Sequence, residues 1–281
     1  MMNFRPSLIA AAVCAASMAL SGPALAQTAP AQPEPTFEPS EGQAGKDVIW
    51  LPTSQVLVDR MLAMARLTPK DHLIDLGSGD GRLVITAAKR GATAHGIEYN
   101  PDFVAFSQRA AQAEGVSQRA TFEKADIFES DFSKATVITL FLLPDLNMRL
   151  RPTLLDMKPG TRVVSNSFNM GDWTPDQTAE VTEGCQSYCQ AFQWTVPAKV
   201  AGTWRLGDGR ELVLKQSFQM LEGSLRQGGQ ARPISEARMD GPRISFVAGG
   251  QRYAGEVNGQ RMQGTVAGGT QWRATQATPR R

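Results

Sequence analysis

Residues 71–84 read DHLIDLGSGDGRLV and join an apolar stretch to a helical one through three closely spaced glycines. Residues 72–76 form a strand-like run, and residues 82–89 carry a helical pattern. A glycine-rich turn at this point lets the backbone approach a ligand closely, because glycine has no Cβ and adopts positive φ freely. The stretch therefore predicts a ligand-binding loop between a strand and a helix.

Helical and strand-like patterns alternate from Val48 to about Pro197 around this loop. Such alternation predicts an α/β fold, with a parallel sheet covered by helices on both faces. Residues 177–181 and 191–196 are expected to close the sheet as an antiparallel hairpin. The expected helices are 54–67, 82–89, 101–115 and 146–157, and the expected strands are 72–76, 93–98, 120–123, 136–143 and 162–167.

The sequence changes in texture near residue 198. Fourteen of the 26 glycines lie after residue 201, and strand-like stretches are separated by GG, NG and GD turn signals. No helical stretch is found there. Residues 198–281 are therefore expected to form a small all-β module, either a barrel or a sandwich, after a sheet domain at 47–197.

The first 26 residues have the pattern of a signal peptide. Arg5 precedes an uncharged apolar run, Leu8–Leu20, and Ala24-Leu25-Ala26 fits the small-residue cleavage rule. The run is shorter than the roughly 20 residues that span a bilayer. We expect cleavage after Ala26, export to the periplasm or medium, and a mature chain without a transmembrane segment. Residues 27–46, rich in Pro, Ala, Gln and Glu, predict a disordered or extended linker.

The net charge and the histidine and cysteine content limit which partners and ligands can be expected. The net charge is +2, and Lys and Arg are spread without long runs, which gives no electrostatic reason to expect nucleic acid. The only histidines are His72 and His95, so no metal site is predicted. Cys185 and Cys189 remain after cleavage, either as a disulfide suited to an oxidising compartment or as two free thiols.

Two kinds of cofactor suit the glycine loop. A dinucleotide requires G-x-G-x-x-G, but counting from Gly77 that third glycine would stand where the chain has Arg82; it falls at Gly81 instead. Asp75, two residues before the loop, would repel a pyrophosphate. The same carboxylate would attract S-adenosylmethionine, which carries an ammonium and a sulfonium and no phosphate. The loop therefore favours S-adenosylmethionine.

Two more acidic residues follow the next strands. Glu98 ends the second strand, where a carboxylate can accept both ribose hydroxyls. Asp126 follows the third strand, where it can bind the adenine amino group, and Ile127 offers an apolar wall. The alternative is that all of these residues are only helix caps and turn residues, but their combination with the glycine loop favours a cofactor site.

Several segments together carry a resemblance to a family: WLPT at 50–53, DLGSGDGRLVITAAKRG, GIEYNP, ADIF and LFLLPDLN. Over about residues 48–175 the chain resembles class I S-adenosylmethionine methyltransferases. It is most similar to the branch that contains the mitochondrial lysine methyltransferases of the ATP synthase c-subunit and the adenine nucleotide translocase, with bacterial relatives. The resemblance implies a Rossmann-like seven-stranded sheet and a segment before the first strand that folds over the cofactor. Trp50 stands where the family usually has Tyr. The predicted cofactor residues are Pro52, Thr53, Asp75, Gly77, Ser78, Gly79, Gly81, Glu98, Asp126, Ile127 and Leu142.

The methyl acceptor should bind at loops that follow the carboxyl ends of the strands. Asp145 and Asp172 are the carboxylates there that could accept a proton, and Trp173 could line the acceptor channel. Asp145 could instead cap a helix, and Trp173 could belong to the core. These three residues are the catalytic candidates.

Three functions remain open from the sequence. The resemblance implies methyl transfer to a protein lysine. The alternatives are a methyltransferase for a small molecule or lipid, and an exported, non-catalytic binding protein on the same fold. Methylation of DNA adenine is not expected, because LLPD at 142–145 lacks the Asp/Asn-Pro-Pro-aromatic loop that holds a flat amine. The segment 164–173 departs from the mitochondrial relatives and leaves the acceptor open.

Overall fold

The computed structural model describes residues 37–277, and the predicted signal peptide and the first part of the predicted linker lie outside them. The chain from Phe37 onward forms one compact unit. Within the described range, no helix has the length and apolar character needed to cross a membrane.

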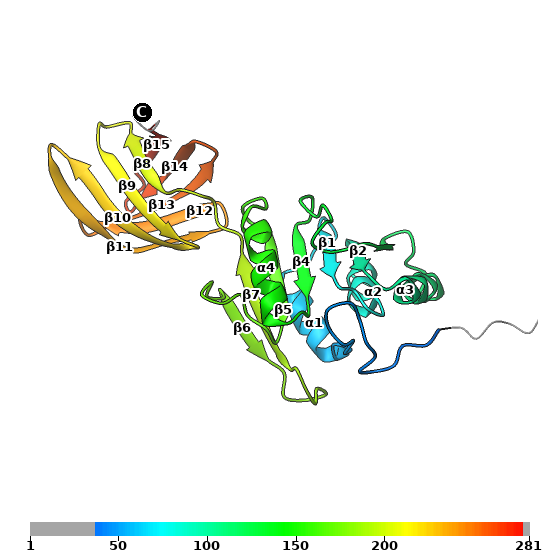
Figure 1. The fold of residues 1–281 in the computed structure, drawn as a ribbon. Helices are drawn as coiled ribbons and strands as arrows, with labels where there is room; N and C mark the ends of the chain where they lie inside the picture. The colour runs from blue at the N-terminus through cyan, green and yellow to red at the C-terminus, as the bar shows by residue number, and fades with distance from the viewer. Residues whose placement is uncertain (1–36, 278–281) are drawn as a thin grey trace, which may run out of the picture. The chain divides into compact units, whose positions relative to one another are not determined.

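A seven-stranded sheet organises the first part of this unit (Figure 1). The strand order is β3-β2-β1-β4-β5-β7-β6; the first five are parallel, and β7 is antiparallel to both β5 and β6. This is the predicted Rossmann-like sheet closed by a hairpin. The elements are α1 (Gln55–Met64), β1 (His72–Leu76), α2 (Arg82–Lys89), β2 (Thr93–Glu98), α3 (Pro101–Ala113), β3 (Ala120–Lys124), β4 (Val137–Leu140), α4 (Pro144–Leu155), β5 (Arg162–Asn166), β6 (Gln177–Glu180) and β7 (Gln190–Thr195).

Burial explains why these segments become central strands and flanking helices. All four residues of β4 are buried, as expected for a strand covered on both faces. The predicted strand 136–143 is shortened to Val137–Leu140, because Pro144 opens α4 at a position that proline favours. In α3, the Asn100 side chain accepts the Asp102 N–H at 2.9 Å and caps the helix.

The second part of the unit is a closed antiparallel barrel of eight strands (Figure 1). Neighbouring strands follow the chain order, and β15 returns to pair with β8. The sequence left a barrel and a sandwich open, and the structure shows the barrel. Its own core contains Trp204, Phe246, Tyr253 and Trp272. The strands are β8 (Gly202–Leu206), β9 (Glu211–Ser217), β10 (Met220–Gln227), β11 (Gln230–Asp240), β12 (Arg243–Ala248), β13 (Gln251–Asn258), β14 (Arg261–Val266) and β15 (Gln271–Gln276).

The predicted boundary near residue 197 falls between β7 and β8. The β9–β10 turn of the barrel contacts the segment that precedes β6. Phe218 in this turn stacks on Trp173 with ring centroids 6.1 Å apart, and Gln219 Nε2 donates to the Thr174 carbonyl at 2.7 Å. Trp173 is completely buried, so the barrel helps to cover one end of the sheet's core.

Candidate active site

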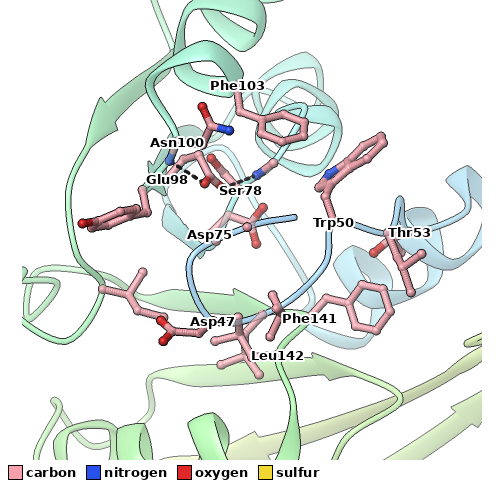
Figure 2. Close-up of a pocket in the computed structure, with 18 of the residues that line it drawn as sticks. Asp47, Trp50, Thr53, Asp75, Ser78, Glu98, Asn100, Phe103, Phe141 and Leu142 are labelled. Carbon is pink, nitrogen blue, oxygen red and sulfur yellow. Dashed lines mark hydrogen bonds between the residues drawn. The ribbon is translucent and has the colours of Figure 1, made fainter. Parts of the chain in front are cut away.

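A cavity of about 490 Å³ opens beside the carboxyl ends of the first strands of the sheet. Asp75 from β1 lies at its centre, with Glu98 from β2 on one side and Phe141, after β4, on the other (Figure 2). Residues 45–53 line it as well. The parallel order of β2, β1 and β4 brings these three strand ends together, as is usual for ligand sites of α/β sheets.

Asp75 is the buried charge of this cavity, with only 7% of the residue exposed. Its Oδ1 accepts a hydrogen bond from Thr139 Oγ1 at 2.7 Å, across the β1–β4 pair. Desolvation raises the pKa of Asp75 to about 7, and the nearby negative charges of Asp80 and Glu98 contribute to the increase. A cationic ligand group beside Asp75 would relieve this cost, whereas an anionic one would increase it.

The glycines of the loop have different roles. Gly79 has φ +50°, and a Cβ placed on it would lie 2.3 Å from Trp50 Nε1, so this glycine lets the indole close over the loop. Gly81, with φ +78°, does not line the cavity. A Cβ there would lie 2.8 Å from both Phe122 and Ser107, so Gly81 allows the start of α2 to pack against β3 and α3.

Glu98 is held in place by backbone groups. Its Oε2 accepts the Gly79 N–H at 2.9 Å, and its Oε1 accepts the Asn100 N–H at 2.9 Å (Figure 2). Each carboxylate oxygen keeps a second lone pair for a ligand. The two bonds therefore fix the position of the carboxylate and leave both of its oxygens able to accept further hydrogen bonds.

Residues 37–53 form a strap, and its residues 45–53 line the cavity. Phe37 packs on Phe103 with ring centroids 5.2 Å apart, and Trp50 packs on the same ring at 5.1 Å. Lys46 donates to Asp126, and this bond lowers the pKa of the carboxyl group. Of the two forms expected for the linker, disordered or extended, residues 37–46 follow the extended one, without helix or strand. This segment is held by a few isolated contacts. Such contacts do not require a periodic hydrophobic pattern, so the sequence gives no sign of them.

The strap is also fixed at its carboxyl end. Arg82 Nη1 donates to the Thr53 carbonyl at 2.9 Å, and Asn166 Nδ2 donates to Thr53 Oγ1 at 3.1 Å. Thr53 thus connects the start of α2 with the end of β5. This explains how Pro52 and Thr53, which lie before α1, come to line the cavity.

The opposite side of the cavity is apolar and aromatic. It is formed by residues that follow β4 and β5 and by one residue of the β6–β7 hairpin. Leu142 faces the glycine loop, and a Cβ on Gly77 would lie 3.3 Å from its Cδ2. Phe141, Phe168 and Tyr188 complete this side.

The cavity lining includes ten of the eleven predicted cofactor residues, all except Gly81. They are Pro52, Thr53, Asp75, Gly77, Ser78, Gly79, Glu98, Asp126, Ile127 and Leu142.

The three catalytic candidates are not brought to the cavity. Asp145 lies exposed in the first turn of α4. The Asp172 side chain is 77% exposed and pairs with Arg151. Trp173 is buried against Trp194, at a ring distance of 5.8 Å. The sequence placed these residues near the strand ends, but their side chains face solvent or the core, and we assign them no catalytic role.

Several lining residues were not predicted. Lys46, Tyr99, Phe103, Phe168 and Tyr188 all border the cavity. Tyr99 directly follows Glu98, a proximity that the sequence shows. The others depend on how distant segments pack, and no spacing rule identifies them.

The donor set fits S-adenosylmethionine. Asp75 would bind its cationic amino-acid part, Glu98 its ribose hydroxyls, and Asp126 with Ile127 its adenine. A pyrophosphate would favour a positively charged side chain on the glycine loop. Residues 77–81 carry none. When bound, this cofactor supplies an activated methyl group on a positively charged sulfur.

Comparison with known proteins gives a consistent result. Residues 75–177 match the model of the ANTKMT methyltransferase domain. A protein-lysine N-methyltransferase of Saccharolobus islandicus (strain REY15A) is 41% identical over 140 residues, which cover 49% of this chain and 87% of the relative. The human ATP synthase c-subunit lysine N-methyltransferase is 35% identical over 128 residues, covering 45% of this chain and 54% of the relative.

A solved structure shares the sheet domain. It is an RNA methyltransferase from Salinibacter ruber in complex with S-adenosyl-L-homocysteine, 44% identical, with a TM-score of 0.50. The match covers 53% of this chain and 96% of that chain.

The sheet order and the acidic cavity define a class I S-adenosylmethionine-dependent methyltransferase. Within that class, the chain belongs to the same family as the protein-lysine N-methyltransferase of Saccharolobus islandicus, which it matches over 87% of that protein's length. It spans about half the length of the mammalian c-subunit methyltransferases that it matches, and the family model ends at residue 177, before the barrel.

Proposed function

We propose that this protein transfers the methyl group of S-adenosylmethionine to the side-chain amine of a protein lysine. The observation that carries the proposal is that one cavity joins the cofactor carboxylates to an apolar, aromatic side at the ends of β4 and β5. The relatives at 41% and 35% identity, both named as lysine N-methyltransferases, support the choice of acceptor.

The chemistry places few demands on the protein. The amine lone pair attacks the methyl carbon, the N–C bond forms as the S–C bond breaks, and the electron pair stays on sulfur. Alignment of donor and acceptor can supply about 7–11 kcal/mol of the barrier. The amine must be neutral when it attacks, and an apolar wall favours the neutral form by desolvation. Phe141 and Leu142 provide such a wall beside the glycine loop.

RNA is the second candidate acceptor, because the 44%-identical structure is that of a protein named as an RNA methyltransferase. A single experiment separates the two. The chain from Gln27 onward is incubated with S-adenosylmethionine labelled in its methyl group, together with cell-envelope protein or total RNA. The products are hydrolysed and the labelled species identified. Asp75→Asn, expected to lose the cofactor, is the matched control.

Label in mono-, di- or trimethyllysine, absent with Asp75→Asn, would support the proposal. Label in a methylated nucleoside alone would replace lysine by RNA. An enzyme that binds the cofactor but labels neither acceptor would argue against both and favour a small-molecule acceptor.

We also propose that the chain acts outside the cytoplasm. The signal-peptide pattern of residues 1–26 supports this, as does the disulfide between Cys185 and Cys189, because such bonds persist in oxidising compartments. Expression of the full chain followed by cell fractionation tests the proposal. A periplasmic or secreted product beginning at Gln27 is the expected result, and a cytoplasmic product with its N-terminus intact would contradict it.

A further inference from the structure

The hairpin between β6 and β7 carries a feature that cofactor binding does not use. A disulfide joins Cys185 to Cys189 across four positions of sequence, and Tyr188 lies within the closed loop. Tyr188 has φ +55°, a left-handed conformation that bulky residues rarely adopt and that the surrounding structure must hold in place. Gly184 anchors the tip, since a Cβ there would lie 3.2 Å from Val56 of α1.

Sheet register brings Tyr188 to the cavity. In the antiparallel β5–β7 pair, Asn166 lies opposite Ala191, so the residues just after β5 and just before β7 emerge at the same edge. The Ser167 N–H donates to the carbonyl of Gln190, the first residue of β7, at 2.8 Å and continues this pairing beyond the end of β5. Phe168 and Tyr188 therefore extend side by side.

Phe141 completes a group of three rings with Phe168 and Tyr188, which we call the aromatic triad. The ring centroids are 6.1 Å apart for Phe141–Phe168, 5.2 Å for Phe141–Tyr188 and 5.9 Å for Phe168–Tyr188. Asn147 supports the triad from α4, because its Nδ2 donates to the Phe168 carbonyl at 3.2 Å.

The exposure of the triad shows that its three rings belong to a binding surface and not to the hydrophobic core. Tyr188 is 43% exposed, and the other two rings are only partly buried, whereas Trp173 and Trp194 in the neighbouring core are completely buried. All three rings line the same cavity as Asp75. The structure thus leaves aromatic faces at the mouth of the cofactor cavity.

We propose that the aromatic triad binds the alkylamine end of the methyl acceptor, and that Tyr188 is a specificity-determining residue held there by the disulfide. The inference rests on the proposed function and deepens it. Ring faces attract the protonated amine or methylamine through cation–π interactions when the acceptor binds, before it loses the proton to solvent for the transfer, and they lower the cost of burying the alkyl stem. Because such a site also retains a methylated amine, it would favour successive methylation of one acceptor.

Removal of the disulfide should affect acceptor binding without affecting cofactor binding. None of the residues assigned to the cofactor lies in the hairpin, so loss of the cross-link should leave cofactor affinity intact. It should free Tyr188 from a backbone conformation that tyrosine does not favour, and thereby remove one ring from the triad.

The test uses butyltrimethylammonium as the probe of the triad. The mature chain from Gln27 is saturated with S-adenosylhomocysteine, whose affinity is measured by calorimetry, and probe binding is followed by saturation-transfer NMR. Tyr188→Ala and the double change Cys185→Ser with Cys189→Ser should each weaken probe binding about two- to fivefold, the value of one exposed cation–π contact. Tyr188→Phe should retain it. Phe106→Ala, which removes a ring outside the cavity lining, is the matched control.

Each outcome has a defined meaning. Unchanged affinity for S-adenosylhomocysteine with the expected losses of probe binding would support the proposal, and would also show that the variants are folded. Probe binding that is absent from the unsubstituted chain, or that is equal in Tyr188→Ala, would overturn the acceptor site but leave the proposed function in place. Failure of the unsubstituted chain to bind S-adenosylhomocysteine would overturn the proposed function itself.

Discussion

Asp75→Asn should make the cofactor-free protein more stable at high pH while it removes cofactor binding. The carboxyl group is almost completely buried, and its pKa is raised to about 7, chiefly by desolvation. Above pH 7 the folded protein must therefore hold a buried negative charge. Asparagine removes the charge, and its amide oxygen can still accept the hydrogen bond from Thr139.

The magnitude follows from the pKa. A carboxyl group whose pKa is raised in the folded state stabilises the fold fully below its unfolded value of 3.8, and this contribution is lost as pH rises through about 7. Each pKa unit corresponds to about 1.4 kcal/mol, so the charge costs on the order of 4 kcal/mol above pH 7. The new amide N–H groups cost about 1–3 kcal/mol if they remain unpaired. We expect a net gain of about 1–3 kcal/mol at pH 8.

The pH dependence of the effect is the sharper quantity, because the amide cost cancels between two pH values. Between pH 8 and pH 5 the advantage of Asp75→Asn should fall by about 3 kcal/mol. This difference is measured by urea unfolding of both proteins at the two pH values. The transition to analyse is the one that S-adenosylhomocysteine shifts in the unsubstituted protein. Calorimetry should show the variant's cofactor affinity reduced by at least about 30-fold, as for loss of one partner of a buried charge pair. An equal effect on stability at both pH values would refute the reasoning.

Three further changes test other parts of the structure. Glu98→Gln replaces one of the two carboxylate oxygens that accept backbone N–H groups, and it should weaken S-adenosylmethionine binding by about 1.5–3 kcal/mol in calorimetry; an unchanged affinity would exclude Glu98 from the cofactor site. Gly81→Ala forces a side chain into positive φ against Phe122, and it should lower the free energy of unfolding by about 2–3 kcal/mol in urea titrations, whereas a neutral effect would show that the loop adapts. Asp71→Ala leaves Arg162 without its buried partner, and it should cost about 3–5 kcal/mol by the same measurement; a loss below about 1 kcal/mol would mean that water replaces the carboxylate.

Much of the cofactor side could be predicted from the sequence because it depends on short-range order. A strand, a glycine turn and a helix fix Asp75 and Gly79 within a few residues of each other. Glu98 ends the neighbouring strand, and parallel pairing, with Asp75 opposite Gly96 in the register, carries it to the same edge. These relations follow from local patterns and from the rules of parallel sheets.

The acceptor side could not be predicted, because it depends on contacts between distant segments. The position of Tyr188 requires the β5–β7 register and the disulfide together. The position of Trp173 depends on Phe218, a residue of the barrel, which covers it from outside the sheet domain. Lys46 reaches Asp126 across 80 residues of sequence from a segment that carries no periodic pattern.

Closure of the barrel has a consequence for how this chain can be taken apart and rebuilt. Because β15 pairs with β8, with Gln276 opposite Trp204, the first and last strands of the module lie side by side. The two ends of the module therefore lie next to each other. Its removal would break no strand pairing of the seven-stranded sheet. The barrel can therefore be exchanged for another domain by protein engineering, provided that the replacement covers Trp173.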